Sequence, residues 1–117
     1  MRVKEVANQK HPSIYEDELA TKARALIRDF SLRILPVVNI EKRLVGVVSR
    51  ASVMTISSSV SPIKVKGIMA NPKYTAMLEN DAYKTVREML RVDEWYIPVV
   101  NTYTEKILKG VLGLENS

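Results

Sequence analysis

The strongest pattern in the sequence is an apolar segment that occurs twice, followed each time by a polar turn and a second apolar segment. The copies comprise residues 34–39 with 44–49, and residues 96–101 with 107–113. The β-branched runs are too short for helices and are bounded by charged residues or Asn, so each copy predicts two strands joined by a turn. Pro36 and Pro98 are 62 residues apart, which is about half of the chain, and this spacing predicts an internal repeat.

Helical periodicity precedes each pair of strands. In the first half we expect a helix that opens at Asp17 or Glu18, where acidic residues suit the helix dipole, and runs to about Phe30. Its apolar stripe comprises Leu19, Ala20, Ala23, Leu26, Ile27 and Phe30. In the second half Asn80 or Asp81 suits an N-cap. The second stripe comprises Ala82, Val86, Met89 and Leu90, which sets the two helices 63 residues apart.

Shorter segments repeat as well. Residues 3–7 predict one helical turn with a counterpart at 65–69, and a short strand at 13–15 has a counterpart at 74–77. A second helix is expected from Arg50 to about Ser57, with no equivalent after the last strand. The serine-rich segment 57–62 then separates two halves, residues 1–60 and 61–117.

Each half therefore predicts a strand, a helix and two strands, with a final helix in the first half only. A three-stranded sheet with its helices on one face leaves the other face apolar and uncovered. The residues expected on that uncovered face are Val37, Val47, Val99 and Val111. Two such halves can cover these faces by packing sheet to sheet about a pseudo-twofold axis.

Composition narrows the possible chemistry. The chain has 117 residues, no cysteine and a single histidine, His11, so we expect no disulfide, no thiolate or histidine metal site and no cofactor built on one. Its four glycines do not form a phosphate-binding loop, and its acids are isolated, which argues against an enzyme. We find no signal-peptide core and no apolar run of membrane-spanning length, so we expect a cytoplasmic protein away from the membrane.

The formal net charge of +5 leaves two interpretations open. The first is a solvated surface with a surplus of lysine and arginine, and the second is a partner that carries phosphate groups. The positive residues are scattered along the chain, so a nucleotide fits this charge better than a nucleic acid does.

Taken together, the repeated segments resemble a tandem pair of CBS domains, the family named for cystathionine β-synthase. The matching segments are residues 3–6, 12–14, 20–30, 35–39 and 46–49 in the first half, and 65–69, 71–72, 82–90, 97–101 and 110–112 in the second. The resemblance covers nearly the whole chain. It implies an α/β (α+β) fold of two CBS repeats, each a small three-stranded sheet with flanking helices.

The same resemblance implies a regulatory module and not a catalyst. Paired CBS domains bind adenosine-containing ligands such as AMP, ADP, ATP or S-adenosylmethionine in the cleft between the repeats. They report that binding to an effector protein, and they commonly form homodimers. We therefore expect an adenine nucleotide, a second copy and an effector protein as partners of this chain.

The family's ribose-binding motif is a Gly, then a Ser or Thr, and an Asp three residues later. In the first half it falls on Gly46, Ser49 and Ser52, so a serine stands where the family has its acid. A neutral hydroxyl makes a hydrogen bond about half as strong as a carboxylate does. In the second half it falls on Gly110, Gly113 and Asn116, whose amide can bond a ribose although Gly113 lacks the hydroxyl.

The resemblance places the other wall of each site at the first short strand and just before the Pro-Val-Val run. The positions are Ile14, Tyr15, Arg33, Ile34 and Pro36 in the first half, and Ala76, Met77, Trp95, Tyr96 and Pro98 in the second. Arg33 can meet a phosphate with its fork of donors or can be a solvated helix-end residue. Trp95 and Tyr96 can stack on a base or pack in the core or between the halves.

Three classes of function remain, in this order. The first is a nucleotide-sensing regulatory module. The second is a ligand-free dimeric scaffold that uses Met54, Ile56 or Met77 as contact patches. The third is a nucleic-acid-binding module, whose affinity would fall steeply with salt.

Overall fold

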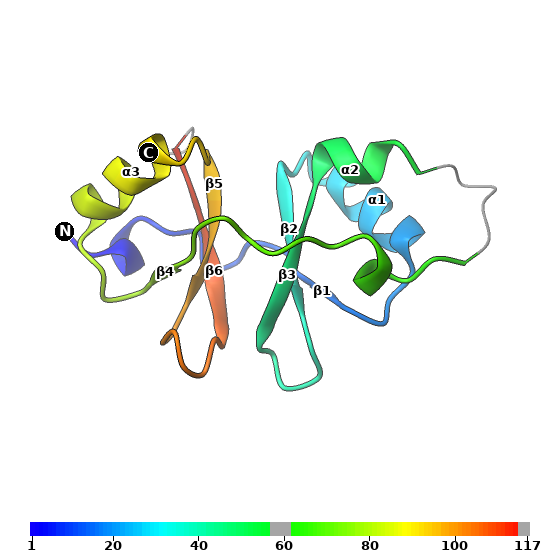
Figure 1. Cartoon of the computed structure of the whole chain (residues 1–117), viewed down its shortest axis with the longest axis horizontal. Coiled ribbons are helices and arrows are strands. Elements are labelled where there is room, and N and C mark those ends of the chain that lie inside the picture. Colours follow the sequence, from blue (N-terminus) through cyan, green and yellow to red (C-terminus); the bar gives the residue numbers. More distant parts are fainter. Residues whose placement is uncertain (57–61, 115–117) are drawn as a thin grey trace. The chain divides into compact units, whose positions relative to one another are not determined.

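The computed structural model describes residues 1–56 and 62–114, and it divides into two compact units (Figure 1). Unit 1 comprises Met1–His11 with Pro72–Ser117, and unit 2 comprises Pro12–Asn71. Each unit therefore takes the first segment of one repeat and the remainder of the other, whereas the sequence suggested the continuous halves 1–60 and 61–117. The expected serine-rich linker, apart from Pro62, lies outside the described residues.

Unit 2 contains one three-stranded sheet, with strand order β1-β2-β3. Its elements in chain order are β1 (Ile14–Tyr15), α1 (Ala20–Asp29), β2 (Ile34–Val38), β3 (Leu44–Ser49), α2 (Arg50–Met54) and the 3-10 helix η2 (Val65–Gly67). Strand β1 is parallel to β2, and β2 is antiparallel to β3.

Unit 1 repeats this arrangement with the sheet order β4-β5-β6. Its elements are the 3-10 helix η1 (Val3–Glu5), β4 (Ala76–Met77), α3 (Ala82–Arg91), β5 (Tyr96–Val100) and β6 (Leu108–Gly113). The predicted order of strands and helices is thus confirmed for the described residues. The expected lack of a final helix concerns residues 115–117, which are not described.

Each sheet buries one face beneath its own helix. In unit 2, Leu35, Val37 and Val48 form a core with Ala23, Ile27 and Val53. In unit 1, Ile97, Val99 and Leu112 form the equivalent core with Met89 and Val3. We call residues 3–7 and 65–69, which contain η1 and η2, the lead-in segments. Val3 of the first lead-in is part of the core that the second repeat builds, and Val65 of the second lead-in is its counterpart in the other unit.

The prediction for the second face of each sheet was half wrong. Val37 and Val99 belong to the cores under the helices. Val47 is paired with Pro36, and Val111 with Pro98. Because successive side chains in a strand point to opposite faces, Val47 and Val111 lie on the face away from the helices.

The first long helix begins later than the acidic residues suggested. The N–H groups of Val65 and Lys66 donate to the carbonyls of Glu18 (2.8 Å) and Glu16 (3.0 Å), so residues 16–18 form a turn after β1 and α1 starts at Ala20. In α3 the expected cap is confirmed, because the Asp81 carboxylate accepts a hydrogen bond from the N–H of Lys84 (3.0 Å).

The two helices start 62 residues apart and not 63, so the predicted register was wrong by one residue. In the structure, residues at the ends of both predicted apolar stripes are exposed to solvent. Phe30 is 62% exposed, Leu90 is 58% exposed and Leu19 is also exposed, whereas Ala23 and Met89 are buried. The two-residue difference between the repeats lies instead between the paired strands, where 101–107 replaces 39–43.

Both long helices end in a Schellman motif without glycine. The N–H of Leu32 donates to the carbonyl of Ile27 at 2.9 Å at the end of α1. The N–H of Glu94 donates to the carbonyl of Met89 at 2.9 Å at the end of α3. Ser31 and Asp93 take the left-handed position, with φ of 53° and 58°. Since that position is usually occupied by glycine, the sequence carries no clear signal for these helix ends.

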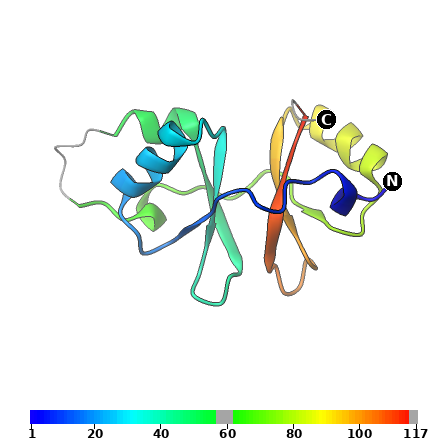
Figure 2. The same cartoon turned by 180° about the vertical axis from the view of Figure 1, so that it is seen from behind.

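The lead-in segments are held by the same set of bonds in both units. The N–H groups of Val3 and Lys4 donate to carbonyls in the turn after β4, as those of Val65 and Lys66 do after β1. An ion pair accompanies each set, Lys4 with Glu79 (2.9 Å) and Lys66 with Asp17 (3.0 Å). Figure 2 shows the dark-blue N-terminal segment beside the yellow, orange and red elements of unit 1.

These ion pairs predict how stability depends on pH. Lys66 donates to Asp17 and lowers the pKa of that carboxyl below its ordinary value, and Lys4 does the same for Glu79. A carboxyl with a lowered folded pKa stabilises the fold above about pH 4, and that contribution is lost as the pH falls through the folded pKa. We expect Lys66→Met to raise the NMR-titrated pKa of Asp17 and to leave that of Glu79 unchanged. Equal changes at both carboxyls would contradict two separate pairs.

The lead-ins also cross the outer strands very closely. Asn8 and Val111 exchange two backbone hydrogen bonds, 2.8 and 3.1 Å long. A Cβ atom on Gly110 would lie 2.5 Å from the carbonyl oxygen of Asn8, so only glycine fits there without movement. We expect Gly110→Ala to lower the free energy of unfolding by about 1–3 kcal/mol.

Gly67→Ala is the matched control for that substitution. A Cβ atom on Gly67 would lie 3.5 Å from the nearest side-chain atom, an ordinary contact with Ile63. Its backbone is not left-handed, so alanine should be neutral or slightly stabilising. Chemical denaturation of both variants measures the difference, and a neutral Gly110→Ala would show that the lead-in does not hold its position on β6.

Candidate functional site

The structure brings together four of the expected ligand contacts at one end of the unit 2 sheet. Ile34 at the start of β2 pairs with Ser49 at the end of β3. Next to them, the N–H of Arg50 donates to the carbonyl of Arg33 at 3.0 Å, which brings the two chain segments together. The Arg33 side chain is exposed and forms no ion pair with the described residues, so its guanidinium is available to an anion.

Ser49 and Ser52 are already hydrogen-bonded to each other. Ser49 is the N-cap of α2, and its hydroxyl accepts from the N–H of Ser52 at 3.1 Å. The Ser49 hydroxyl also donates to the Ser52 hydroxyl (3.0 Å), which in turn donates to the Ser49 carbonyl (3.0 Å). A ribose hydroxyl would have to replace or extend these bonds, because a hydroxyl carries only one proton.

The remaining first-half residues lie further along the same sheet. Ile14 pairs with Val37 and Tyr15 with Val38, at the far end of β2 from Ile34. Three residues of strand separate these positions, about 10 Å. Ile14 is 3% exposed within the core and Pro36 is buried, so the side chain of Ile14 does not reach a ligand. Ile14 can contribute to binding only through its backbone, as the family resemblance implies.

Unit 1 holds the second-half positions in the same places. Ala76 and Met77 pair with Val99 and Val100, Tyr96 pairs with Gly113, and Pro98 is buried. The N–H of Leu114 donates to the carbonyl of Trp95 at 2.9 Å, which is the counterpart of the bond between Arg50 and Arg33. Trp95 is half-exposed, so it is not a core residue of its unit. Asn116 lies outside the described residues.

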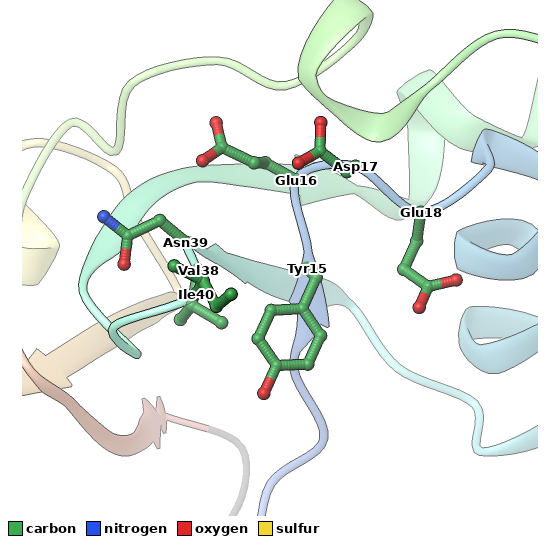
Figure 3. Close-up of a pocket in the computed structure, with 7 residues that line it drawn as sticks. All are labelled: Tyr15, Glu16, Asp17, Glu18, Val38, Asn39 and Ile40. Carbon is green, nitrogen blue, oxygen red and sulfur yellow. The ribbon is translucent and has the colours of Figure 1, made fainter.

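A pocket of about 400 Å³ opens at the other end of the unit 2 sheet, and Tyr15 is the one lining residue that was among the expected ligand contacts. Its lining comprises Tyr15, Glu16, Asp17, Glu18, Val38, Asn39 and Ile40. Figure 3 shows Tyr15 and Glu18 projecting to one side of the chain and Glu16 and Asp17 to the other. The signal that could have revealed it is the run of three acids directly after the short strand.

Lysine side chains neutralise part of this acidic lining. Asp17 is paired with Lys66 (3.0 Å) and Lys64 (4.0 Å), and Glu18 is paired with Lys22 (3.3 Å). Glu16 forms no ion pair within the described part of the chain. Because the lining residues include three acids and no base, the pocket does not suit the phosphates of a nucleotide.

The described ranges 1–56 and 62–114 contain neither a cluster of metal ligands nor a membrane-spanning helix. No group of three or more potential metal ligands of the His, Cys, Asp or Glu type was found there. None of the helices in those ranges has the length and apolar character needed to cross a bilayer.

The sheet order, the short parallel first strand and the paired lead-ins agree with a known family. Residues 3–59 match the model of the CBS domain. Residues 3–59 are a CBS domain. Comparison with curated proteins found no significant match. Because unit 1 repeats the elements of unit 2 in the same order, the whole chain has the architecture of two CBS repeats.

Solved CBS structures support this fold over nearly the full chain. The CBS domains of a transcriptional regulator from Streptococcus pneumoniae are 19% identical, with a TM-score of 0.85 and coverage of 99% of this chain and 95% of that one. The CBS domain pair of protein MJ0100, in complex with 5′-methylthioadenosine and S-adenosyl-L-methionine, is 18% identical with a TM-score of 0.80. The match covers 99% of this chain and 91% of that one. The CBS domain of a bacterial CNNM/CorC family Mg²⁺ transporter, in complex with ATP, is 20% identical with a TM-score of 0.82. The match covers 99% of this chain and 83% of that one.

Proposed function

We propose that this CBS pair is a regulatory module that binds an adenosine-containing ligand and carries out no catalysis itself. The observation that carries the proposal is the cluster of Ile34, Ser49 and Ser52, with Arg33 beside it, at one end of the unit 2 sheet. Two proteins with the same fold are in complex with such ligands, one with S-adenosyl-L-methionine and 5′-methylthioadenosine and the other with ATP.

Each group in this cluster has a distinct part in the proposed binding. The hydroxyls of Ser49 and Ser52 contact the ribose. They are hydrogen-bonded to each other, and the two hydroxyls of a ribose can add to this hydrogen-bond network. The backbone around Ile34 contacts the base, and the Arg33 guanidinium meets a phosphate. Without a carboxylate, the ribose contact is weaker than in the family pattern, so the phosphate contact weighs more in affinity.

Calorimetry with AMP, ADP, ATP and S-adenosylmethionine tests the proposal directly. We expect at least one of the four to bind, and the phosphate-bearing ligands to lose affinity in Arg33→Gln. A ligand at 100 times its dissociation constant would stabilise the fold by about 2.7 kcal/mol, which a thermal-shift series detects. If none of the four ligands binds or stabilises the protein, the nucleotide proposal is wrong.

Supplying the missing acid should tighten binding. In Ser52→Asp a carboxylate replaces a hydroxyl next to Ser49, and hydrogen bonds to a charged acceptor are about twice as strong as neutral ones. We expect roughly a fivefold to tenfold gain in adenosine affinity, corresponding to about 1–1.4 kcal/mol. The control is Thr55→Asp, which places the same charge one helical turn further along and should leave the affinity unchanged. Equal effects of the two substitutions would mean that the ribose does not lie at Ser52.

The scaffold alternative needs different residues from those expected. Met54 and Ile56, expected in contact patches, are partly buried against the unit 2 core, and Met77 is also partly buried. The helix α3 instead exposes Tyr83 (72%) and Leu90 (58%). These residues are seven positions apart and therefore lie on one face of the helix.

We propose that this face of α3 contributes to a homodimer. The expected result is a dimer in sedimentation experiments, and Leu90→Glu should shift it toward monomer, because a buried unpaired charge is costly in an interface. Lys84→Glu, on the same helix with no ion pair among the described residues, is the charge-change control. A wild-type monomer would contradict the dimer, and a dimer unaffected by Leu90→Glu would place the interface elsewhere.

A further inference from the structure

The acidic pocket of unit 2 has an exact positional counterpart in unit 1, because the surrounding backbone is the same in both. The turn after β1 is closed by a bond from the N–H of Glu18 to the carbonyl of Tyr15 (3.1 Å). The turn after β4 is closed by the equivalent bond from Asn80 to Met77 (3.1 Å). Asn80 therefore occupies the position of Glu18, 62 residues on.

Further bonds confirm the equivalence around the two turns. The N–H of Glu16 donates to Val38 at 2.9 Å, and the N–H of Leu78 donates to Val100 at 3.1 Å. The ion pair of Asp17 with a lead-in lysine is matched by that of Glu79, as described above. The backbone that forms the pocket wall is thus repeated in both units. What lies over the turn in each unit must therefore depend on the side chains and on the loop between the paired strands.

In unit 1 a tyrosine reaches this position. The hydroxyl of Tyr103 donates to Oδ1 of Asn80 at 3.1 Å, across 23 residues of sequence. Tyr103 is only half-exposed, and its partial burial raises the pKa of its hydroxyl. A phenol ring with a hydrogen-bond donor therefore covers the turn after β4.

Loop length explains why unit 2 has no such ring. The loop 101–107 has seven residues and carries Tyr103, whereas the loop 39–43 has five. Lys42 and Lys106 hold the same left-handed position near the end of each loop, with φ of 68° and 60°. The two additional residues thus lie before Lys106, in the part of the loop that presents Tyr103. The shorter loop presents Ile40, which is 89% exposed beside the pocket.

We propose that the pocket lined by Tyr15, Glu18, Val38 and Ile40 binds a small arylalkylamine, an aromatic ring that carries an ammonium group. The ring takes the place that Tyr103 has in unit 1, beside the Tyr15 ring and the exposed side chain of Ile40. The donor end of the ligand bonds to Glu18, the counterpart of Asn80. This site is separate from the proposed nucleotide contacts at Ser49 and Ser52.

The charge of the pocket selects for a cation over a neutral phenol. Glu18 replaces a neutral amide with an acceptor-only carboxylate, on the same side of the chain as the Tyr15 ring (Figure 3). The Tyr15 ring already attracts a cation, since Nζ of Lys42 lies 4.9 Å from its centroid. The pairing of Glu18 with Lys22 at 3.3 Å, at the surface, is an exchangeable contact that an ammonium can replace.

Tyramine titrated into the full chain and followed by amide NMR tests the site. We expect saturable shifts confined to residues 15–18 and 38–40. Removing either half of the probe should weaken binding about tenfold, so p-cresol (no ammonium) and butylamine (no ring) are the comparison compounds. Absence of saturable shifts up to about 10 mM tyramine, or equal binding of butylamine, would overturn the proposal.

Two pairs of variants locate the ligand. Glu18→Gln should weaken tyramine binding about fivefold, as expected for loss of a charge-assisted hydrogen bond at a partly exposed site. Glu41→Gln, an equal charge change next to Ile40 in the loop 39–43 but outside the lining, should not change it. Equal affinities for the two variants would exclude Glu18 as the partner of the ammonium.

The second pair uses the chain's own tyrosine as a competitor. Replacing residues 40–42 by the sequence of residues 102–106 introduces the longer loop with its tyrosine, and this graft should abolish tyramine binding. The control graft carries serine in place of that tyrosine and should retain more binding, although Ile40 is lost in both. Equal loss in the two grafts would show that the ring does not enter the pocket. Ser52→Asp should leave tyramine binding unchanged, which separates this site from the nucleotide proposal.

Discussion

The fold depends on a small set of backbone hydrogen bonds that tie each lead-in segment to the turn after a short strand. In both units two consecutive lead-in N–H groups donate to carbonyls two residues apart, and a lysine of the lead-in pairs with an acid of the turn. The valine of each lead-in is fully buried in the core above that turn. Because the lead-in of one repeat completes the unit built from the other, neither hydrophobic core is completed by one continuous repeat, although each sheet is.

This constraint also determines which side chains are available for binding. The sequence predicts a helix that opens at Asp17 or Glu18, but the carbonyls of Glu16 and Glu18 accept hydrogen bonds from the lead-in at Val65 and Lys66. Residues 16–18 are therefore held in a turn, and they line a pocket with Tyr15. The same backbone in unit 1 carries Leu78 and Asn80, and a longer loop places Tyr103 over it. One repeated scaffold therefore supports two different surfaces.

At the opposite end of the unit 2 sheet, the proposed ribose contacts have a structural role of their own. Ser49 caps α2 and is hydrogen-bonded to Ser52 in both directions, so these hydroxyls already stabilise the start of a short helix. Binding there exchanges internal hydrogen bonds for ligand bonds, and the net gain of such an exchange is small. The Arg33 guanidinium forms no ion pair with the described residues, so in the proposed binding its charge favours ligands that carry a phosphate.

The sequence by itself determined the repeat, the order of strands and helices, the Asp81 cap and the family, because apolar periodicity and short motifs are local properties. It also placed Ile34 next to Ser49, since the hairpin between them fixes their pairing. The tertiary structure alone decided the start of α1, the helix register, the buried positions of Val37 and Val99, and the acidic pocket. The start of α1 and the acidic pocket depend on hydrogen bonds between segments about 45 to 50 residues apart, which leave no periodic signal in the chain. Ser31 and Asp93 end their helices in a left-handed conformation that is uncommon for their residue types, so the sequence does not predict it and the folded structure must hold it.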